Sequence, residues 1–246
     1  MKKKLKTAIW AEIPDKHNAF AAKNSFLRGE NFFGQLVSSL SYSEMLFFTL
    51  CGKKPTEIEA EKFNLVLNAC SNPGIRDEAS RSAMNCSVGK GPLVNSVLAG
   101  LLTRTGTVRG SEWIKLVMIN LMKCNENGEK ITGSHQYSGL GKHFGSADYR
   151  ASELISVLSE KKHIEKFQRL LIDSSDDDYP VLLEGLIAAA FLDLNFTPDQ
   201  GAFLFLISSA AAFFAFSEEQ GKAGYKEYPS FFGKDEYQYV QPDESQ

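Results

Sequence analysis

The chain has 246 residues, of which 43% are hydrophobic and 23% are charged, the composition of a folded globular protein. Its 27 basic and 30 acidic residues leave a formal net charge of −3. That balance argues against a protein that coats nucleic acid or binds an anionic membrane, because either would carry an excess of basic residues. The length suits one large domain, or a large domain joined to a small one.

Signals for metal binding, secretion and membrane insertion are weak. The four cysteines include no closely spaced pair of the kind that a zinc site needs. The basic cluster at residues 2–4 is not followed by an apolar segment of secretory length. The longest uncharged apolar run, residues 201–216, is shorter than the roughly 18–20 residues that span a bilayer. We therefore expect a cytoplasmic protein with no bound metal and no membrane segment.

The first half of the chain has helical patterning and lacks the alternation typical of strands. Ser41 and Glu44 form a capping box that starts a helix, and Gly52 ends it. Gly89-Lys90-Gly91 lacks the spacing of a phosphate-binding loop and is expected to be a turn. The other helices expected here lie at residues 32–40, 55–70, 78–88, 92–102 and 113–124, with a further turn at 72–74.

The second half begins with a loop and continues with helices. Residues 133–147 contain four glycines and little helical pattern, and a structured loop of this length is often functional. Amphipathic helices are expected at residues 151–158 and 163–172, an acidic linker at 174–178, and strongly apolar core helices at 180–194 and 198–220. The tail from residue 221 is expected to be irregular and frayed at 242–246. The predicted fold class is all-α.

Residues 139–145 are the strongest candidate site by pattern. Gly139 and Gly141 allow the backbone to approach a ligand closely, and the adjacent Lys142 and His143 can bind carboxylates or move protons. Arg150 follows, and its guanidinium can bind a carboxylate through two parallel hydrogen bonds. The alternative is a surface loop followed by a helix that Asp148 caps. The pattern leaves both interpretations open.

Several motifs occur in an order that resembles the citrate synthase family, and especially its short members of the citryl-CoA lyase type. The resemblance spans residues 7–235. The matching segments are FLRGEN at 26–31, LSYSEMLF at 40–47, GKKPT at 52–56, LAGLL at 98–102, GSE at 110–112, GLG at 139–141, DYRA at 148–151, EGLIAAAFLDLNF at 184–196 and EEQ at 218–220.

The resemblance implies an all-helical homodimer, with a large domain of residues 1–112 and 179–246 and a small domain of residues 113–178. Family members join or cleave a carbon–carbon bond between acetyl-CoA and a 2-oxo acid. Coenzyme A enters as a thioester substrate, and no cofactor stays bound.

Family roles can be assigned residue by residue. Glu184 aligns with the family's catalytic Asp and is expected to be the base. His143 or Lys142 is expected to bind the oxo-acid carbonyl, and Arg150 its carboxylate. Gly139 and Gly141 complete the predicted substrate-binding loop.

The chain departs from the family at several of these positions. The family's first histidine falls on Val108–Arg109, and the histidine of the glycine-rich loop falls on Lys142. A family arginine and a later histidine align with Ser209 and Phe216. Two functions follow. The first is an acyl-CoA enzyme of citrate synthase or citryl-CoA lyase type with altered specificity, whose substrates are an acyl-CoA and a 2-oxo acid or citryl-CoA. The alternative is a non-catalytic binding or regulatory subunit that forms a heteromer with an active paralogue.

Overall fold

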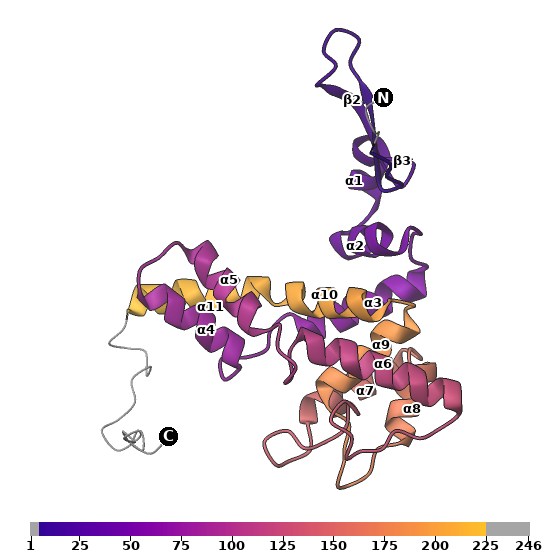
Figure 1. The fold of residues 1–246 in the computed structure, drawn as a ribbon, viewed down its shortest axis with the longest axis vertical. Coiled ribbons are helices and arrows are strands. Elements are labelled where there is room, and N and C mark those ends of the chain that lie inside the picture. The colour runs from indigo at the N-terminus through magenta and orange to yellow at the C-terminus, as the bar shows by residue number, and fades with distance from the viewer. Residues whose placement is uncertain (1–4, 225–246) are drawn as a thin grey trace, which may run out of the picture. The chain divides into compact units, whose positions relative to one another are not determined.

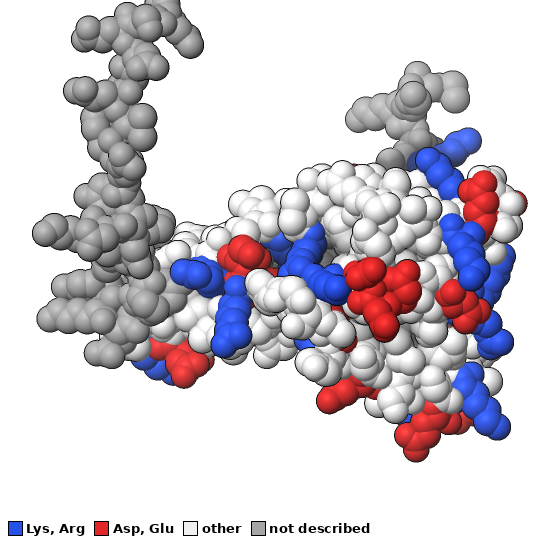
Figure 2. Space-filling model, turned by 90° about the horizontal axis from the view of Figure 1, so that it is seen from below, with Lys and Arg blue, Asp and Glu red and all other residues white. Residues whose placement is uncertain are grey.

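The computed structural model describes residues 5–224, which are mostly helical (Figure 1). Within this range the chain packs as two compact units. The first unit comprises residues 5–70 and 107–205, and the second comprises residues 71–106 and 206–224. Charged side chains of both signs are interspersed on the face drawn in Figure 2, which fits the nearly balanced composition.

The first unit starts with a small antiparallel sheet, which the sequence analysis did not predict. Strand β1, Trp10–Pro14, pairs with β2, Ala22–Leu27, which pairs in turn with β3, Glu30–Asn31. Every residue of β1 is exposed, and only two residues of β2, Ser25 and Leu27, are buried. The hairpin therefore has no long buried face, and it lacks the alternating pattern by which strands are predicted. The all-α class is otherwise confirmed.

The helices that follow the sheet begin and end at the expected signals. After the π-helical turn η1, Phe32–Leu36, and the short α1, Val37–Ser39, helix α2 covers Tyr42–Cys51. The side chains of Ser41 and Glu44 make both hydrogen bonds of the predicted capping box, and Gly52 ends α2 in the left-handed region at φ 74°. Helix α3 covers Glu57–Cys70.

The core of the first unit is built around α9, Leu183–Asp193, which is buried on all sides apart from its ends. Helices α6, Ser111–Asn127, α7, Tyr149–Glu160, and α8, Lys166–Asp173, pack against it. An aromatic cluster extends this core, with ring centroids 5.2–5.9 Å apart between Phe47 and Phe63, Phe47 and Phe196, and Phe191 and Phe196.

The second unit has a smaller core. Helices α4, Glu78–Val88, and α5, Leu93–Thr103, pack with α11, Ala210–Ala223. Gly100 of α5 lies against Phe213, and a Cβ there would come within 2.8 Å of the ring. Glycine is therefore needed for this close approach.

Helix α10, Pro198–Ser208, is followed almost directly by α11. The continuous run Pro198–Ala223 has the length and apolar composition of a membrane span. One such helix is weak support for a membrane span, because a core helix of a globular protein can have the same length and apolar composition. Helix α11 continues to Ala223, three residues beyond the expected helix end at residue 220. The rest of the tail expected to be irregular, including the expected frayed end at 242–246, lies outside the described residues.

The two compact units differ from the domains that the resemblance implies. Helix α8 and all but the first two residues of α6 lie in the expected small domain of residues 113–178, and both helices share one core with α9. Residues 71–106, expected to belong to the large domain, pack with α11 as a separate unit. The division into 1–112 with 179–246 and 113–178 stays a prediction.

Candidate functional site

The loop that carries the candidate residues is fixed to the segment before α9 by backbone hydrogen bonds. The Leu182 N–H donates to the Gly139 carbonyl at 3.1 Å, and the Gly141 N–H donates to the Pro180 carbonyl at 2.7 Å. A Cβ on Gly185 would lie only 2.1 Å from the Gly139 oxygen. Gly185 therefore lets the loop backbone at Gly139 approach the α9 backbone closely. The approach of Gly139 and Gly141 to a ligand stays a prediction.

His143 begins a tight turn. Its N–H donates to the Ser146 carbonyl at 2.7 Å, and the Ser146 N–H donates back at 3.1 Å. The two central residues, Phe144 and Gly145, have φ values of 49° and 83°, as in a type I′ turn. The Phe144 ring packs edge-on against the imidazole at 4.5 Å. The turn thereby fixes both the backbone and one face of His143.

Asp148 is buried and connects α7 to α9. Its Oδ1 accepts from the Arg150 N–H at 3.2 Å, so Asp148 caps α7 as the sequence predicted. Its Oδ2 accepts from the Leu183 N–H at 3.0 Å. Arg150 also donates through Nε and Nη2 to the two carboxylate oxygens, each at 2.8 Å. Arg150 therefore makes a forked pair of hydrogen bonds to the Asp148 carboxylate. Its predicted binding of a ligand carboxylate stays a prediction.

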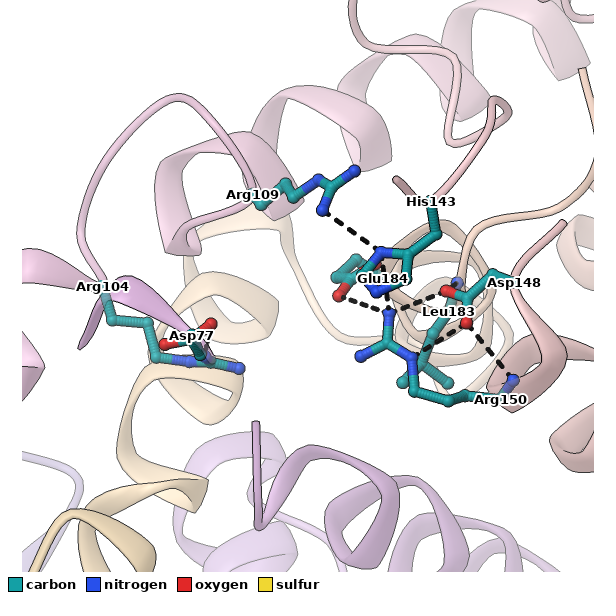
Figure 3. Close-up of polar contacts among 8 residues, drawn as sticks. All are labelled: Asp77, Arg104, Arg109, His143, Asp148, Arg150, Leu183 and Glu184. Carbon is teal, nitrogen blue, oxygen red and sulfur yellow. Dashed lines mark hydrogen bonds and ion pairs between the residues drawn. The ribbon is translucent and has the colours of Figure 1, made fainter. Parts of the chain in front are cut away.

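Three of the predicted residues converge at Arg150 (Figure 3). Its Nη2 lies 3.3 Å from Glu184 Oε1 and 3.4 Å from His143 Nδ1. Glu184 belongs to the first turn of α9, His143 to the loop, and Arg150 to the first turn of α7. The cluster is thus assembled from three segments of the first unit.

Arg109 is a fourth member that the sequence analysis did not single out as a functional residue. Its Nη1 lies 3.1 Å from His143 Nδ1, and its guanidinium lies over the Phe144 ring at 5.4 Å (Figure 3). The signal was present, because residues 108–109 are the position of the family's first histidine. By sequence alone this position indicates the loss of a histidine, although an arginine there can still donate hydrogen bonds.

The two guanidinium groups determine the tautomer of His143. A guanidinium only donates, so Nδ1 accepts and the ring proton is on Nε2. Burial lowers the pKa of His143, and the charges of Arg150 and Arg109 lower it further against the opposing effect of Asp148 and Glu184. His143 is therefore neutral near pH 7 and presents an Nε2–H donor.

The Asp148–Arg150 pair is ionised over a wide pH range. Burial acts to raise the pKa of Asp148, but the hydrogen bonds from Arg150 and from the Leu183 N–H outweigh it, and the net pKa is lowered. The hydrogen bond to Asp148 raises the pKa of Arg150. The pair therefore positions the Arg150 guanidinium beside Glu184 and His143.

Lys142 does not join this cluster. Its side chain is exposed, and its Nζ lies 3.6 Å from Asp178 of the acidic linker. Ser209 and Phe216, which align with a family arginine and histidine, belong to the second unit. Within residues 5–224, no group of three His, Cys, Asp or Glu side chains is arranged to bind a metal ion.

The chain matches no family model, and its sequence matches no curated protein. Its fold is that of the citrate synthase-like proteins. Citryl-CoA lyase from Hydrogenobacter thermophilus superimposes with a TM-score of 0.74 at 19% identity, over 98% of this chain and 96% of that one. ATP citrate lyase from Methanothrix soehngenii, solved with citrate and coenzyme A, gives a TM-score of 0.77 at 16% identity, over 99% of this chain and 43% of that one.

Citrate synthase itself has the same fold over a smaller part of the chain. The enzyme from Thermoplasma acidophilum, in a ternary complex with carboxymethyl coenzyme A and oxaloacetate, gives a TM-score of 0.57 at 19% identity, over 82% of this chain and 60% of that one. At these identities the likeness shows the fold, and the resemblance stated from the motifs is confirmed at that level.

Proposed function

We propose that this protein forms or cleaves a carbon–carbon bond next to an acyl-CoA thioester, in a reaction of citrate synthase or citryl-CoA lyase type. The observation that supports this function is the contact of Arg150 with both Glu184 and His143 in a citrate synthase-like fold. The cluster combines a carboxylate, a neutral imidazole donor and a fixed guanidinium. These are the groups that enolate chemistry beside a carbonyl needs.

In the direction of bond formation, Glu184 is the base. Its Oε1 contacts Arg150, while Oε2 has no hydrogen-bond partner among residues 5–224. Oε2 removes a proton from the carbon next to the thioester carbonyl, which leaves an enolate. The enolate carbon attacks the carbonyl carbon of the 2-oxo acid, whose oxygen takes up the negative charge and then a proton from water, while Glu184 releases its proton to water.

His143 Nε2–H hydrogen-bonds that carbonyl oxygen and stabilises its developing charge. In the direction of cleavage the same steps run backwards: the hydroxyl loses its proton to water and the carbon–carbon bond breaks. Glu184, protonated from water, then donates its proton to the enolate carbon. We assign the carbonyl-binding role to His143 and not to Lys142, because Lys142 is oriented toward Asp178.

The remaining expectations from the resemblance belong to this proposal. The coenzyme A thioester is a substrate, and the protein acts as a cytoplasmic homodimer. The alternative is a non-catalytic subunit, and one observation favours it: both carboxylates of the cluster, Asp148 and Glu184, are already paired with Arg150, as in a purely structural ion-pair network.

The test is direct turnover by the purified full-length chain. The protein is incubated with acetyl-CoA and a panel of 2-oxo acids, and separately with citryl-CoA, while consumption of the thioester and formation of the joined or cleaved products are measured. We expect turnover in one direction, and a loss of about 10²–10⁴-fold in kcat for Glu184→Gln, the range typical of a lost general base. Lys142→Gln is the matched control, and its kcat should stay near the wild-type value.

Absence of turnover by the wild-type protein across the whole panel would overturn the proposal. Copurification from the native host would then test the alternative, since a regulatory subunit should be recovered with an active citrate synthase-like partner.

A further inference from the structure

The two arginines of the cluster differ in what surrounds their charges. Arg150 is paired with Asp148 and with Glu184. Arg109 forms no ion pair with any residue in the described range, and Glu112, three residues further along, forms none either. The contacts of the Arg109 guanidinium are a neutral imidazole and the face of an aromatic ring. Its charge therefore has no local counterion within residues 5–224.

The donors that each arginine still offers also differ. A guanidinium binds a carboxylate best through two parallel N–H groups, and Nε–H and Nη2–H on one edge of the group form such a pair. In Arg150 this edge is occupied by the two Asp148 oxygens, each at 2.8 Å. In Arg109 the contact to His143 uses Nη1, and Nε and Nη2 contact no hydrogen-bond acceptor in the described range. The same edge that Asp148 occupies on Arg150 is therefore empty on Arg109.

The net charge of the cluster also favours Arg109 as the residue that binds an anion. Without Arg109, the cluster consists of one cation, Arg150, two carboxylates, Asp148 and Glu184, and the neutral His143. Such a group carries net negative charge and would repel a carboxylate ligand. Arg109 cancels that charge and is the member with donors left for an anion. It is also in contact with His143, whose Nε2–H is the free donor for a carbonyl.

We propose that Arg109, and not Arg150, binds a carboxylate of the ligand, while Nε2–H of His143 binds a carbonyl oxygen of the same molecule. The ligand class is an oxo acid, and this cluster binds one of its carboxylates. The identity of the ligand as a substrate rests on the proposed function, but its binding does not. Arg150 is then a positioning residue, which acts through Glu184 and His143.

The experiment measures binding separately from turnover. Calorimetry or ligand-observed NMR gives the Kd of the full-length protein for pyruvate, 2-oxoglutarate and oxaloacetate, and for acetone as an uncharged ketone. We expect at least one oxo acid to bind, and Arg109→Gln to weaken it by about 10- to 100-fold, the range for hydrogen bonds to a charged group. Arg109→Lys keeps the charge but loses the paired donors, so its Kd should lie between those of the wild type and Arg109→Gln. The weak binding of acetone should not change.

The control is Lys142→Gln, which removes an exposed cation from the same loop and should change the oxo-acid Kd less than twofold. Thermal unfolding checks that each variant is folded, and Arg109→Lys keeps the test usable if Arg109→Gln is unstable. The proposal is overturned if no oxo acid binds the wild type at up to about 10 mM, or if Arg109→Gln binds as the wild type does.

The two proposals fail differently. Oxo-acid binding that depends on Arg109, in a protein without turnover, would refute the proposed function and support the carboxylate site. Turnover by Arg109→Gln with an unchanged KM would refute the carboxylate site alone.

Discussion

His143 is the residue on which both proposals depend, and its protonation state follows from its neighbours. Two guanidinium groups face Nδ1, so a second ring proton there would meet two cations. The proposed role uses the neutral ring with its proton on Nε2. Protonation would therefore remove His143 from its contact with Arg109 and abolish the arrangement.

The pH dependence of His143 follows from this. Because burial and the two arginines lower its pKa, the midpoint of the fall in turnover on acidification should lie below 6.5, the ordinary value of an imidazole. Arg109→Gln removes one repelling charge, so the pKa of His143 should rise in that variant. A ¹⁵N NMR titration of the imidazoles measures the pKa of His143 in the wild type and in Arg109→Gln. An unchanged or lower pKa in Arg109→Gln would contradict the contact, and Lys142→Gln is the matched control.

Asp148 is the residue whose loss should cost most stability. It accepts hydrogen bonds from two backbone N–H groups and pairs with Arg150 while buried. Because the Arg150 side chain is 40% exposed, water partly screens the pair. Asp148→Asn should therefore lower the free energy of unfolding by about 1–3 kcal/mol, the cost of weakening the hydrogen bonds of a buried polar group. Urea denaturation at pH 7 measures it. Asp177→Asn, in the exposed linker, should change it by less than about 0.5 kcal/mol.

The acid dependence of this effect has a definite sign. The pKa of Asp148 is lower in the folded than in the unfolded protein, so its contribution is complete above the unfolded value of about 3.9 and is lost as the pH falls through the folded pKa. The difference between wild type and Asp148→Asn should therefore shrink as the pH is lowered below about 4. A difference that is constant down to pH 2 would contradict the assignment.

The contact between the candidate loop and α9 shows how two elements position the site. The Gly139 carbonyl lies where a Cβ on Gly185 would be, and α9 carries Glu184 at the adjacent position. The loop carries His143. The distance between the proposed base and the proposed carbonyl donor is therefore set by a backbone-to-backbone approach that only glycine allows.

Gly185→Ala should separate these elements. The added methyl group cannot be accommodated by moving a flexible side chain, because its neighbour is the Gly139 backbone at 2.1 Å. Overpacking of this kind costs about 1–3 kcal/mol, and a shift of about 1 Å at the site can lower activity by about 10²-fold. Urea denaturation measures the loss of stability, and kcat/KM measures the loss of activity. Gly91→Ala is the control, because no atom lies within 4 Å of its Cβ position, and it should behave as wild type.

The whole molecule is expected to be a homodimer, as the resemblance to the citrate synthase family implies. Light scattering on the purified 27.3 kDa chain tests this directly, since a dimer should have twice that mass. A monomeric mass across the accessible concentration range would contradict it. The measurement is independent of turnover and of oxo-acid binding.

Local interactions made most of the helical fold predictable. The capping box of Ser41 and Glu44, the left-handed Gly52 and the Asp148 cap each act within a few residues, so the sequence shows them directly. The β1–β2 hairpin was missed because its exposed residues carry no alternating apolar pattern. The division into two domains stays a prediction, because it depends on which distant helices share a core and local patterns do not show this.

Sequence order alone determined that this chain is a mostly helical, citrate synthase-like protein in which Glu184, His143 and Arg150 are the residues to examine. Only the tertiary structure decided what each can do. It brought His143 and not Lys142 to Glu184, paired Arg150 with Asp148, and left Arg109 with free donors. The physical reason is that a residue's type and spacing specify its hydrogen-bonding capacity, whereas long-range packing determines which partners use that capacity.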